Sequence, residues 1–190
     1  MARNGNKTKK LLARTALELF VRKGITETTV RDIAAAAGLA EGTLYRHFDS
    51  KDELAWELFH TNYTAFAQEL DRLQQQYDPL KDKLAAMISQ FCTFFDQDPV
   101  LFGYLLLAQH TQLKKVTPEM ETAVTVLQKV IAQGMARREI PAGEVEVAAA
   151  MVLGLVLQVA VFKAYNRITQ DLSELSEALV AACWRVLAGD

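Results

Sequence analysis

Hydrophobic residues recur at intervals of three and four along most of the chain, which is the spacing of one face of an α-helix. In the first predicted helix, Leu12, Ala16, Leu19 and Phe20 share one face. No clear alternation of hydrophobic and polar residues marks a strand. We therefore expect an all-α fold of nine helices, at about 7–23, 30–37, 41–48, 51–75, 79–96, 99–113, 118–138, 144–166 and 172–188.

Glycine, proline and capping residues mark the joints between these helices. Residues 1–6 are predicted to be a frayed arm. Thr29 and Asp32 stand three apart, as in a capping box, and Gly24 and Gly38 end the first two helices. Asp98-Pro99 follows the pattern of an N-cap with proline at the first helical position. The same pattern predicts helix starts at Asp78-Pro79 and Thr117-Pro118, and Asp171 with Glu174 predicts a cap for the last helix.

The third predicted helix has an outer face that suits a DNA groove. At about 100° per residue, Leu44 and Phe48 point inward while Gly42 and Arg46 point outward. Gly42 permits a close approach of the backbone, and Arg46 can donate two hydrogen bonds to a guanine edge. Hydroxyl, imidazole and ammonium donors for phosphates are supplied by Thr43, Tyr45, His47 and Lys51.

The charge distribution agrees with binding to a polyanion at one end of the chain. Residues 1–51 hold ten Lys or Arg against five acids, a balance of +5, whereas the whole chain is at −2, which leaves −7 for residues 52–190. A basic module on an acidic body favours nucleic acid as the partner of the module. We expect a helix-turn-helix DNA-binding domain at 1–51 and a separate helical domain at 52–190.

The stretch from Thr29 to Leu54, with Ala16, Leu19, Phe20 and Gly24 before it, resembles the DNA-binding signature of the tetracycline-repressor (TetR) family. The resemblance covers about residues 9–55. It implies phosphate contacts by Thr29, Tyr45, His47 and Lys51, and positions at or near base edges for Gly42, Thr43 and Arg46. The sequence departs from the family at Ala40, where a Ser or Thr usually caps the third helix, and Glu41 places an acid at the groove end.

Large aromatic side chains are frequent in the body of the chain. The resemblance implies that 52–190 form a helical effector-binding and dimerisation domain with a cavity for a small-molecule effector. An apolar or aromatic effector fits the apolar lining. The alternative is that these side chains form the core. Candidate pocket residues are Phe59, Tyr63, Phe66, Phe91, Phe95, Tyr104, His110 and Gln158.

The last two helices are predicted to pair with the same helices of a second chain. The helix at 144–166 is apolar nearly all round, and one chain seldom buries such a helix completely. The resemblance implies a two-fold dimer and hence a pseudo-palindromic operator. The alternative is that both helices complete the core of one chain. Candidate interface residues are Ala150, Gly154, Val161, Leu175, Leu179, Ala182 and Val186.

Other functions find little support in the sequence. The three histidines are scattered, no metal-spaced cluster or phosphate loop occurs, and we expect no enzyme activity, cofactor or metal. Cys92 and Cys183 lie in apolar stretches and are predicted to be reduced core residues. Val147–Phe162 is shorter than the ~20 residues of a membrane span and is predicted to be a buried helix. With no credible signal peptide, we expect a cytoplasmic protein. The expected function is a ligand-responsive dimeric repressor; the alternative is a helical dimeric interaction protein with a degenerate DNA reader, which Ala40 and Glu41 favour.

Overall fold

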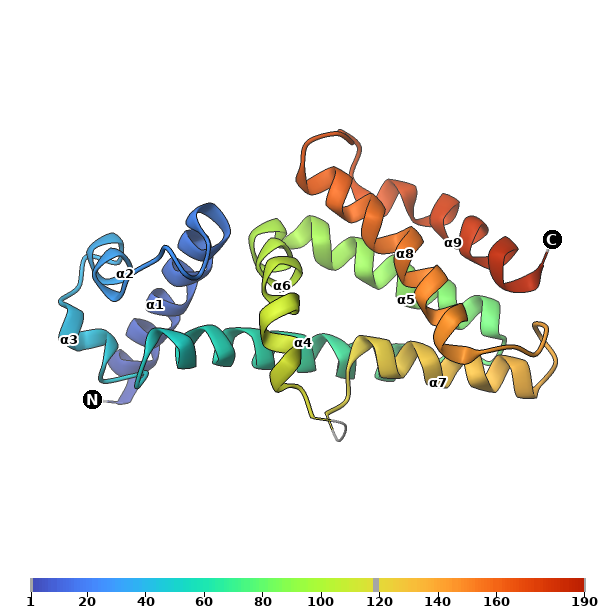
Figure 1. Ribbon diagram of the computed structural model, residues 1–190, viewed down its shortest axis with the longest axis horizontal. Helices are drawn as coiled ribbons and strands as arrows, with labels where there is room; N and C mark the ends of the chain where they lie inside the picture. The colour runs from blue at the N-terminus through green and yellow to red at the C-terminus, as the bar shows by residue number, and fades with distance from the viewer. Residues whose placement is uncertain (1, 118–119, 190) are drawn as a thin grey trace. The chain divides into compact units, whose positions relative to one another are not determined.

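The computed structural model describes residues 2–117 and 120–189, without the side chains of 2–4, 107, 109–111 and 113. Within these residues the chain forms nine α-helices and one short 3-10 helix and contains no strand, which confirms the predicted all-α fold (Figure 1). The helices are α1 (Ala2–Lys23), α2 (Val30–Ala36), α3 (Glu41–Leu44), α4 (Lys51–Gln74), α5 (Leu80–Gln97), α6 (Pro99–Gln112), α7 (Ala123–Ala136), α8 (Val145–Ala164) and α9 (Leu172–Ala188), with the 3-10 helix η1 at Leu113–Lys115.

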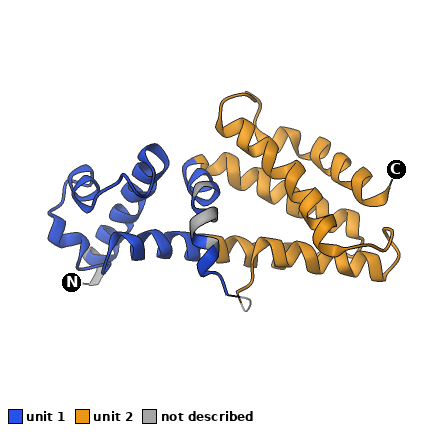
Figure 2. Ribbon diagram, in the orientation of Figure 1, with its two compact units in different colours: residues 1–62, 100–117 blue, residues 63–99, 118–190 orange. Residues whose placement is uncertain are grey.

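The helices form two compact units (Figure 2). Unit 1 holds residues 1–62 and 100–117, and unit 2 holds residues 63–99 and 118–190. This division differs from the domain boundary expected at residue 51. Helix α4 runs without a break through both units, and α6 packs with the N-terminal helices. The first half of α4 and nearly all of α6 are therefore structural parts of the unit that carries α1, α2 and α3.

Unit 1 has a core of its own, built from the apolar faces that the spacing predicts. The inward residues of α1 are Leu12, Ala16, Leu17, Leu19 and Phe20, all less than 10% exposed. They pack with buried residues of the other helices of the unit, namely Ile33, Ala34, Leu44, Phe48, Leu54, Ala55, Phe59, Phe102, Tyr104 and Ala108. Burial of this apolar surface is the main force that holds the unit together.

In unit 2, α5 is the central helix and packs against α7, α8 and α9. Gly134 lets α7 approach α5 closely, because a Cβ at this position would lie 2.3 Å from Cδ2 of Leu80. Around the same joint, Leu80 N donates to Glu139 Oε2 over 2.6 Å and Arg137 forms an ion pair with Asp78. Cys92 and Cys183 are free and buried, as predicted, and burial raises the pKa of each thiol to about 11.

The helix starts agree with the predicted caps in some places and differ in others. Residues 2–6 continue α1 and are not a frayed arm. Pro99 opens α6 as expected, but Pro79 is itself the N-cap of α5. Helix α7 begins at Ala123 with a capping box from Thr122, later than the predicted start at Pro118, which lies outside the described residues.

The start of α9 is capped from another helix. Asp171 precedes α9 but makes no side-chain cap. Instead, the carboxylate of Asp96 on α5 accepts hydrogen bonds from Leu172 N at 3.0 Å and Ser173 N at 2.9 Å. Burial opposes ionisation of this carboxyl, but these bonds and the positive charge of Lys163 outweigh it and lower the pKa of Asp96. The sequence shows no local signal for this cap, because its partners lie more than seventy residues apart.

Helix α8 is less buried than predicted. It is 20 residues long, and by length and composition it is the one described helix that could cross a membrane. Only 22% of the apolar stretch of this helix is buried. Its buried residues, Ala149, Val152, Val156 and Ala160, lie on one side of the helix. The prediction of a buried helix is therefore wrong for the single chain.

Candidate nucleic-acid interface and effector-binding residues

The turn between α2 and α3 has the geometry of a tight helix-turn-helix connection. Gly38 lies in the left-handed region at φ 67°, and Leu39 N donates to Ala34 O over 2.9 Å. A left-handed residue of this kind ends the helix and reverses the chain within a few residues, and glycine adopts it without strain. The turn therefore sets α3 directly beside α2, with which it packs.

The segment of α3 and the turn after it divides into two faces as predicted. Leu44 and Phe48 are 0% and 3% exposed and enter the core of unit 1. Tyr45 is 55% exposed, and Gly42 and Arg46 are exposed beside it. Regular α-helix ends at Leu44 rather than at Phe48, and a Cβ at Gly42 would meet no atom within 4 Å. Of the other candidates, Thr43 and His47 are half-buried at the edge of the exposed face.

Ala40 is the N-cap of α3, and no side chain caps the helix there. This agrees with the departure noted in the sequence, because an alanine side chain cannot accept a hydrogen bond. The absent cap coincides with a helix of only four residues. Glu41, the second departure, lies exposed in the first turn.

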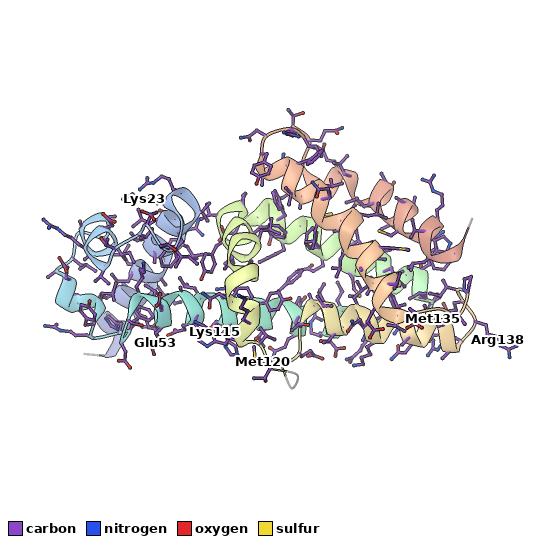
Figure 3. All side chains as sticks on the ribbon, in the orientation of Figure 1. Lys23, Glu53, Lys115, Met120, Met135 and Arg138 are labelled. Carbon is purple, nitrogen blue, oxygen red and sulfur yellow. The ribbon has the colours of Figure 1, made fainter. Side chains whose placement is uncertain are left out.

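Thr29 and Asp32 form the predicted capping box at the start of α2. Thr29 Oγ1 accepts from Asp32 N at 3.1 Å, and Asp32 Oδ2 accepts from Thr29 N at 3.0 Å. These bonds from Thr29, with an ion pair to Lys23 at 3.4 Å, lower the pKa of Asp32 (Lys23 is labelled in Figure 3). Thr29 Oγ1 is the acceptor in this box, so the hydroxyl hydrogen can still be donated to a phosphate.

Lys51 is the first residue of α4 and is tied to the turn after α1. Its Nζ donates to Ile25 O at 2.7 Å and to Thr26 O at 3.2 Å. An ammonium group has three hydrogens, so one donor remains for an anion. Ser50 caps the same helix by accepting from Glu53 N at 3.0 Å (Glu53 is labelled in Figure 3). The sequence indicated a phosphate contact for Lys51 but not its bonds to the turn.

The candidate pocket residues are divided between the two units. Phe59 and Tyr104 are each 0% exposed within unit 1, where Phe59 stacks on Trp56 and Tyr104 on Phe20. The hydroxyl of Tyr104 donates to the carbonyl of Ala55. Both side chains thus have structural partners in this unit.

Unit 2 holds most of the remaining candidates. Phe66 stacks on Phe94 with ring centroids 4.8 Å apart and meets Phe91 at 6.4 Å, while Phe95 is buried at 3% exposure. Phe94 is not among the predicted pocket residues, although it lies next to Phe95 in the sequence. Burial raises the pKa of Tyr63 although a hydrogen bond with Thr122 opposes the shift. Gln158 is exposed on α8, and the side chain of His110 lies outside those described.

The candidate interface residues fall mainly on exposed or half-buried surface of α8 and α9. Ala150, Gly154 and Val186 are exposed, and a Cβ at Gly154 would meet no atom within 4 Å. Val161, Leu175 and Ala182 are half-buried. Leu179 is only 7% exposed and belongs to the core of the single chain instead. The structure adds three exposed apolar residues of α8 to this surface, Val147, Met151 and Phe162, at 52%, 50% and 38% exposure.

Known proteins resemble both the N-terminal segment and the whole chain. Residues 12–58 match the family described as "Bacterial regulatory proteins, tetR family". A protein of Mycobacterium tuberculosis, named as a transcriptional regulator of mycofactocin biosynthesis, is 33% identical over 130 residues, which are 65% of this chain and 61% of that protein. The fatty acid metabolism regulator protein of Bacillus subtilis is 25% identical over 170 residues, 87% of this chain and 88% of its own.

Solved structures share the fold over nearly the full length. A TetR family transcription regulator from Marinobacter aquaeolei has a TM-score of 0.81 at 18% identity, with 99% of each chain covered. The transcriptional regulator FadR from Bacillus subtilis, solved in complex with stearoyl-CoA, has a TM-score of 0.76 at 22% identity and covers 95% of this chain and 98% of its own. The helix-turn-helix segment of this protein is therefore similar to the tetR family of bacterial regulatory proteins, and the chain shares the fold of a solved TetR family regulator over nearly its full length.

Proposed function

We propose that the protein is a dimeric transcriptional repressor that binds a pseudo-palindromic DNA site and leaves it when a small apolar effector binds. The exposed face of α3 carries the proposal. Tyr45 is 55% exposed in a segment whose other face is closed by Leu44 and Phe48, and Gly42 and Arg46 lie beside it. An exposed tyrosine and arginine around a glycine form a surface that fits a major groove and its phosphates.

In this proposal the donors around α3 have separate tasks. Arg46 and Thr43 read base edges, and Gly42 lets the backbone approach them. Tyr45 and His47 bind phosphates from the same segment. Thr29, at the start of α2, and Lys51, at the start of α4, bind phosphates from positions where free backbone N–H groups already favour an anion. In this proposal the protein acts on DNA in the cytoplasm and catalyses no reaction.

Selection of duplexes from a random-sequence pool tests DNA binding without knowledge of the operator. We expect enrichment of an inverted repeat whose half-sites lie about one helical turn apart, or further apart if two dimers share the site. Arg46→Ala should be passed through the same selection as a control. Failure of the wild type to enrich any duplex would contradict the proposal and favour the alternative of an interaction protein with a degenerate reader.

The dimer is proposed from the uncovered surface of α8. Val147, Met151 and Phe162 are exposed with Gly154 open between them, an apolar stripe that water disfavours and a second copy would cover. Light scattering after gel filtration should give twice the chain mass. Gly154→Glu should give monomers, whereas Ser89→Glu, at an exposed site on α5, should leave the dimer intact. A monomeric wild type would contradict the dimer.

For the effector we propose a fatty acyl-CoA. The Bacillus subtilis FadR structure holds stearoyl-CoA, and unit 2 of this chain carries a cluster in which Phe66 packs with Phe91 and Phe94. Tyr63 lies three residues before Phe66 in the sequence. Together these side chains offer an apolar lining to an acyl chain. Stearoyl-CoA should release the selected duplex from the protein, and free coenzyme A should not. Release by neither compound would remove this effector class and leave DNA binding untouched.

A further inference from the structure

Lys83 of α5 is buried, and its positive charge has no carboxylate partner in the described part of the chain. The side chain is 9% exposed, and its Nζ donates to Oε1 of Gln74 on α4 at 2.8 Å. Gln74 is 2% exposed, and its amide oxygen is uncharged. An ammonium group has three hydrogens, so this single bond leaves two donors of Lys83 for another acceptor. A buried charge of this kind is stabilised when an anion binds to it.

The neighbouring acid does not supply this anion. Asp71, three residues before Gln74 on α4, accepts from Nζ of Lys129 at 3.1 Å and from Nε2 of Gln74 at 3.2 Å. Its negative charge is therefore already matched by Lys129 on α7. Two positive charges stand against one negative charge in this group, which leaves one positive charge for a bound anion to balance.

An apolar seam leads from Lys83 to the ring cluster of unit 2. Gln74 meets Lys83 at one level of the seam. Phe66 meets Phe91 at a second level, eight residues back along α4 and eight residues forward along α5, so the two helices are antiparallel. At 1.5 Å per residue the two levels are about 12 Å apart. The side chains midway between them are apolar and only 4% and 5% exposed, namely Leu70 and Met87.

The second half of α4 is held to α5 through long side chains. In the described part of unit 2 the closely packed helix pairs are α5 with α7, α8 and α9, and α8 with α7 and α9, and α4 belongs to none of them. The rings of Phe66, Phe91 and Phe94 are only half-buried. Side chains change rotamer far faster than packed helices move, so these rings can separate and admit an alkyl chain between α4 and α5.

We propose that Lys83 is the anion-binding end of a site for an unesterified fatty acid, an inference that rests on the effector binding proposed above. The carboxylate accepts from Nζ of Lys83, and the alkyl chain lies along Met87 toward the rings of Phe66 and Phe91. Hydrogen bonds between an ammonium and a carboxylate are among the strongest in proteins. A coenzyme A head group is too large for a position that is nine-tenths buried, so the free acid is a second ligand beside the acyl-CoA.

The test compares decanoate with 1-decanol, an uncharged ligand of the same chain length, by titration calorimetry on the whole protein without DNA. We expect the wild type to bind decanoate about tenfold or more tightly than the alcohol, because the carboxylate gains a charge-assisted hydrogen bond. A purely apolar site would show the reverse preference, since burying a carboxylate without a cation is costly.

Two variants show whether Lys83 is the source of this preference. Lys83→Met removes the ammonium and keeps an unbranched side chain. Lys81→Met removes the same charge from an exposed position two residues away on α5. We expect Lys83→Met to bind decanoate about tenfold or more weakly and 1-decanol as the wild type does, whereas Lys81→Met should bind both ligands as the wild type does. Circular dichroism checks that both variants keep the helical content of the wild type.

Equal binding of decanoate and 1-decanol to the wild type would overturn the inference, even if Lys83→Met does not fold. Undiminished decanoate binding by a folded Lys83→Met would overturn it too and would restrict Lys83 to its bond with Gln74. If stearoyl-CoA binds and decanoate does not, this inference fails and the proposed effector stands. If neither binds, the proposed effector fails as well.

Discussion

The hydroxyl of Tyr104 donates a hydrogen bond to the main-chain carbonyl of Ala55, and this contact joins α6 to the first half of α4 inside unit 1. The ring of Tyr104 stacks on Phe20 of α1 with centroids 5.8 Å apart. Burial raises the pKa of Tyr104 far above its ordinary value, so the hydroxyl remains a donor at neutral pH. One side chain of α6 thus meets both α1 and α4.

Tyr104→Phe should destabilise unit 1 without disturbing its packing. The variant keeps the ring against Phe20 and removes only the donor to Ala55, which should cost about 0.5–1.5 kcal/mol of unfolding free energy. Hydrogen exchange of the α1 and α4 amides measures the loss locally. Tyr77→Phe, at a residue 43% exposed, is the matched control and should have little effect. Equal exchange in the wild type and Tyr104→Phe would show that the bond adds no net stability.

Asp96→Asn should weaken the start of α9. The ionised carboxylate accepts from two backbone N–H groups, and a neutral amide replaces it poorly, at a cost of about 1–2 kcal/mol. The pKa of Asp96 is lowered in the folded state, so its stabilisation is present above the ordinary aspartate pKa and is lost as pH falls through the folded value.

Urea unfolding between pH 3 and pH 7 measures this dependence. The difference between the wild type and Asp96→Asn should be full at pH 7 and should shrink below about pH 4. Glu177→Gln, at an exposed position of α9, controls for loss of a negative charge. A difference that does not change with pH would show that the charge of Asp96 has no part in the cap.

Ala40→Ser should stabilise α3. A serine at this N-cap can accept from a backbone N–H of the first turn, which contributes about 0.5–2 kcal/mol. Thermal unfolding should shift upward, and affinity for the selected duplex should rise if the recognition segment is partly unfolded in free protein. Ala35→Ser, at an exposed position inside α2, supplies no cap and should not stabilise. A serine that lowers stability would mean that another group already satisfies these N–H groups.

Lys51→Ala should affect stability and DNA binding together. Loss of Nζ leaves the carbonyls of Ile25 and Thr26 without this donor and should cost about 1 kcal/mol. The slope of log affinity against log salt should fall by about 1 for every DNA sequence alike. Reduced stability with an unchanged slope would restrict Lys51 to its structural bonds.

Arg46→Ala should relax the choice of base rather than overall affinity. A bidentate contact to guanine contributes about 1–3 kcal/mol of discrimination, so one base pair in each half-site should lose its preference. Competition between the selected duplex and its single-base variants measures this effect. Equal weakening on every sequence would instead identify Arg46 as a phosphate contact.

The sequence by itself determined the helices and the recognition segment, because both depend on residues close together in the chain. The spacing of Leu44 and Phe48 was enough to separate the buried and exposed faces of α3, and Thr29 with Asp32 was enough to begin α2. Ala40 already indicated a helix without a side-chain cap. Spacing, turns and caps act over a few residues, so they can be read before the chain is folded.

Only the tertiary structure decided which distant groups meet. It placed Tyr104 against Ala55 and Phe20, and it used Asp96 instead of Asp171 to cap α9. It also buried Leu179 and left Met151 exposed, a choice that helical periodicity leaves open when a helix is apolar on most sides. These outcomes depend on the packing of surfaces far apart in sequence, and no local pattern contains that information.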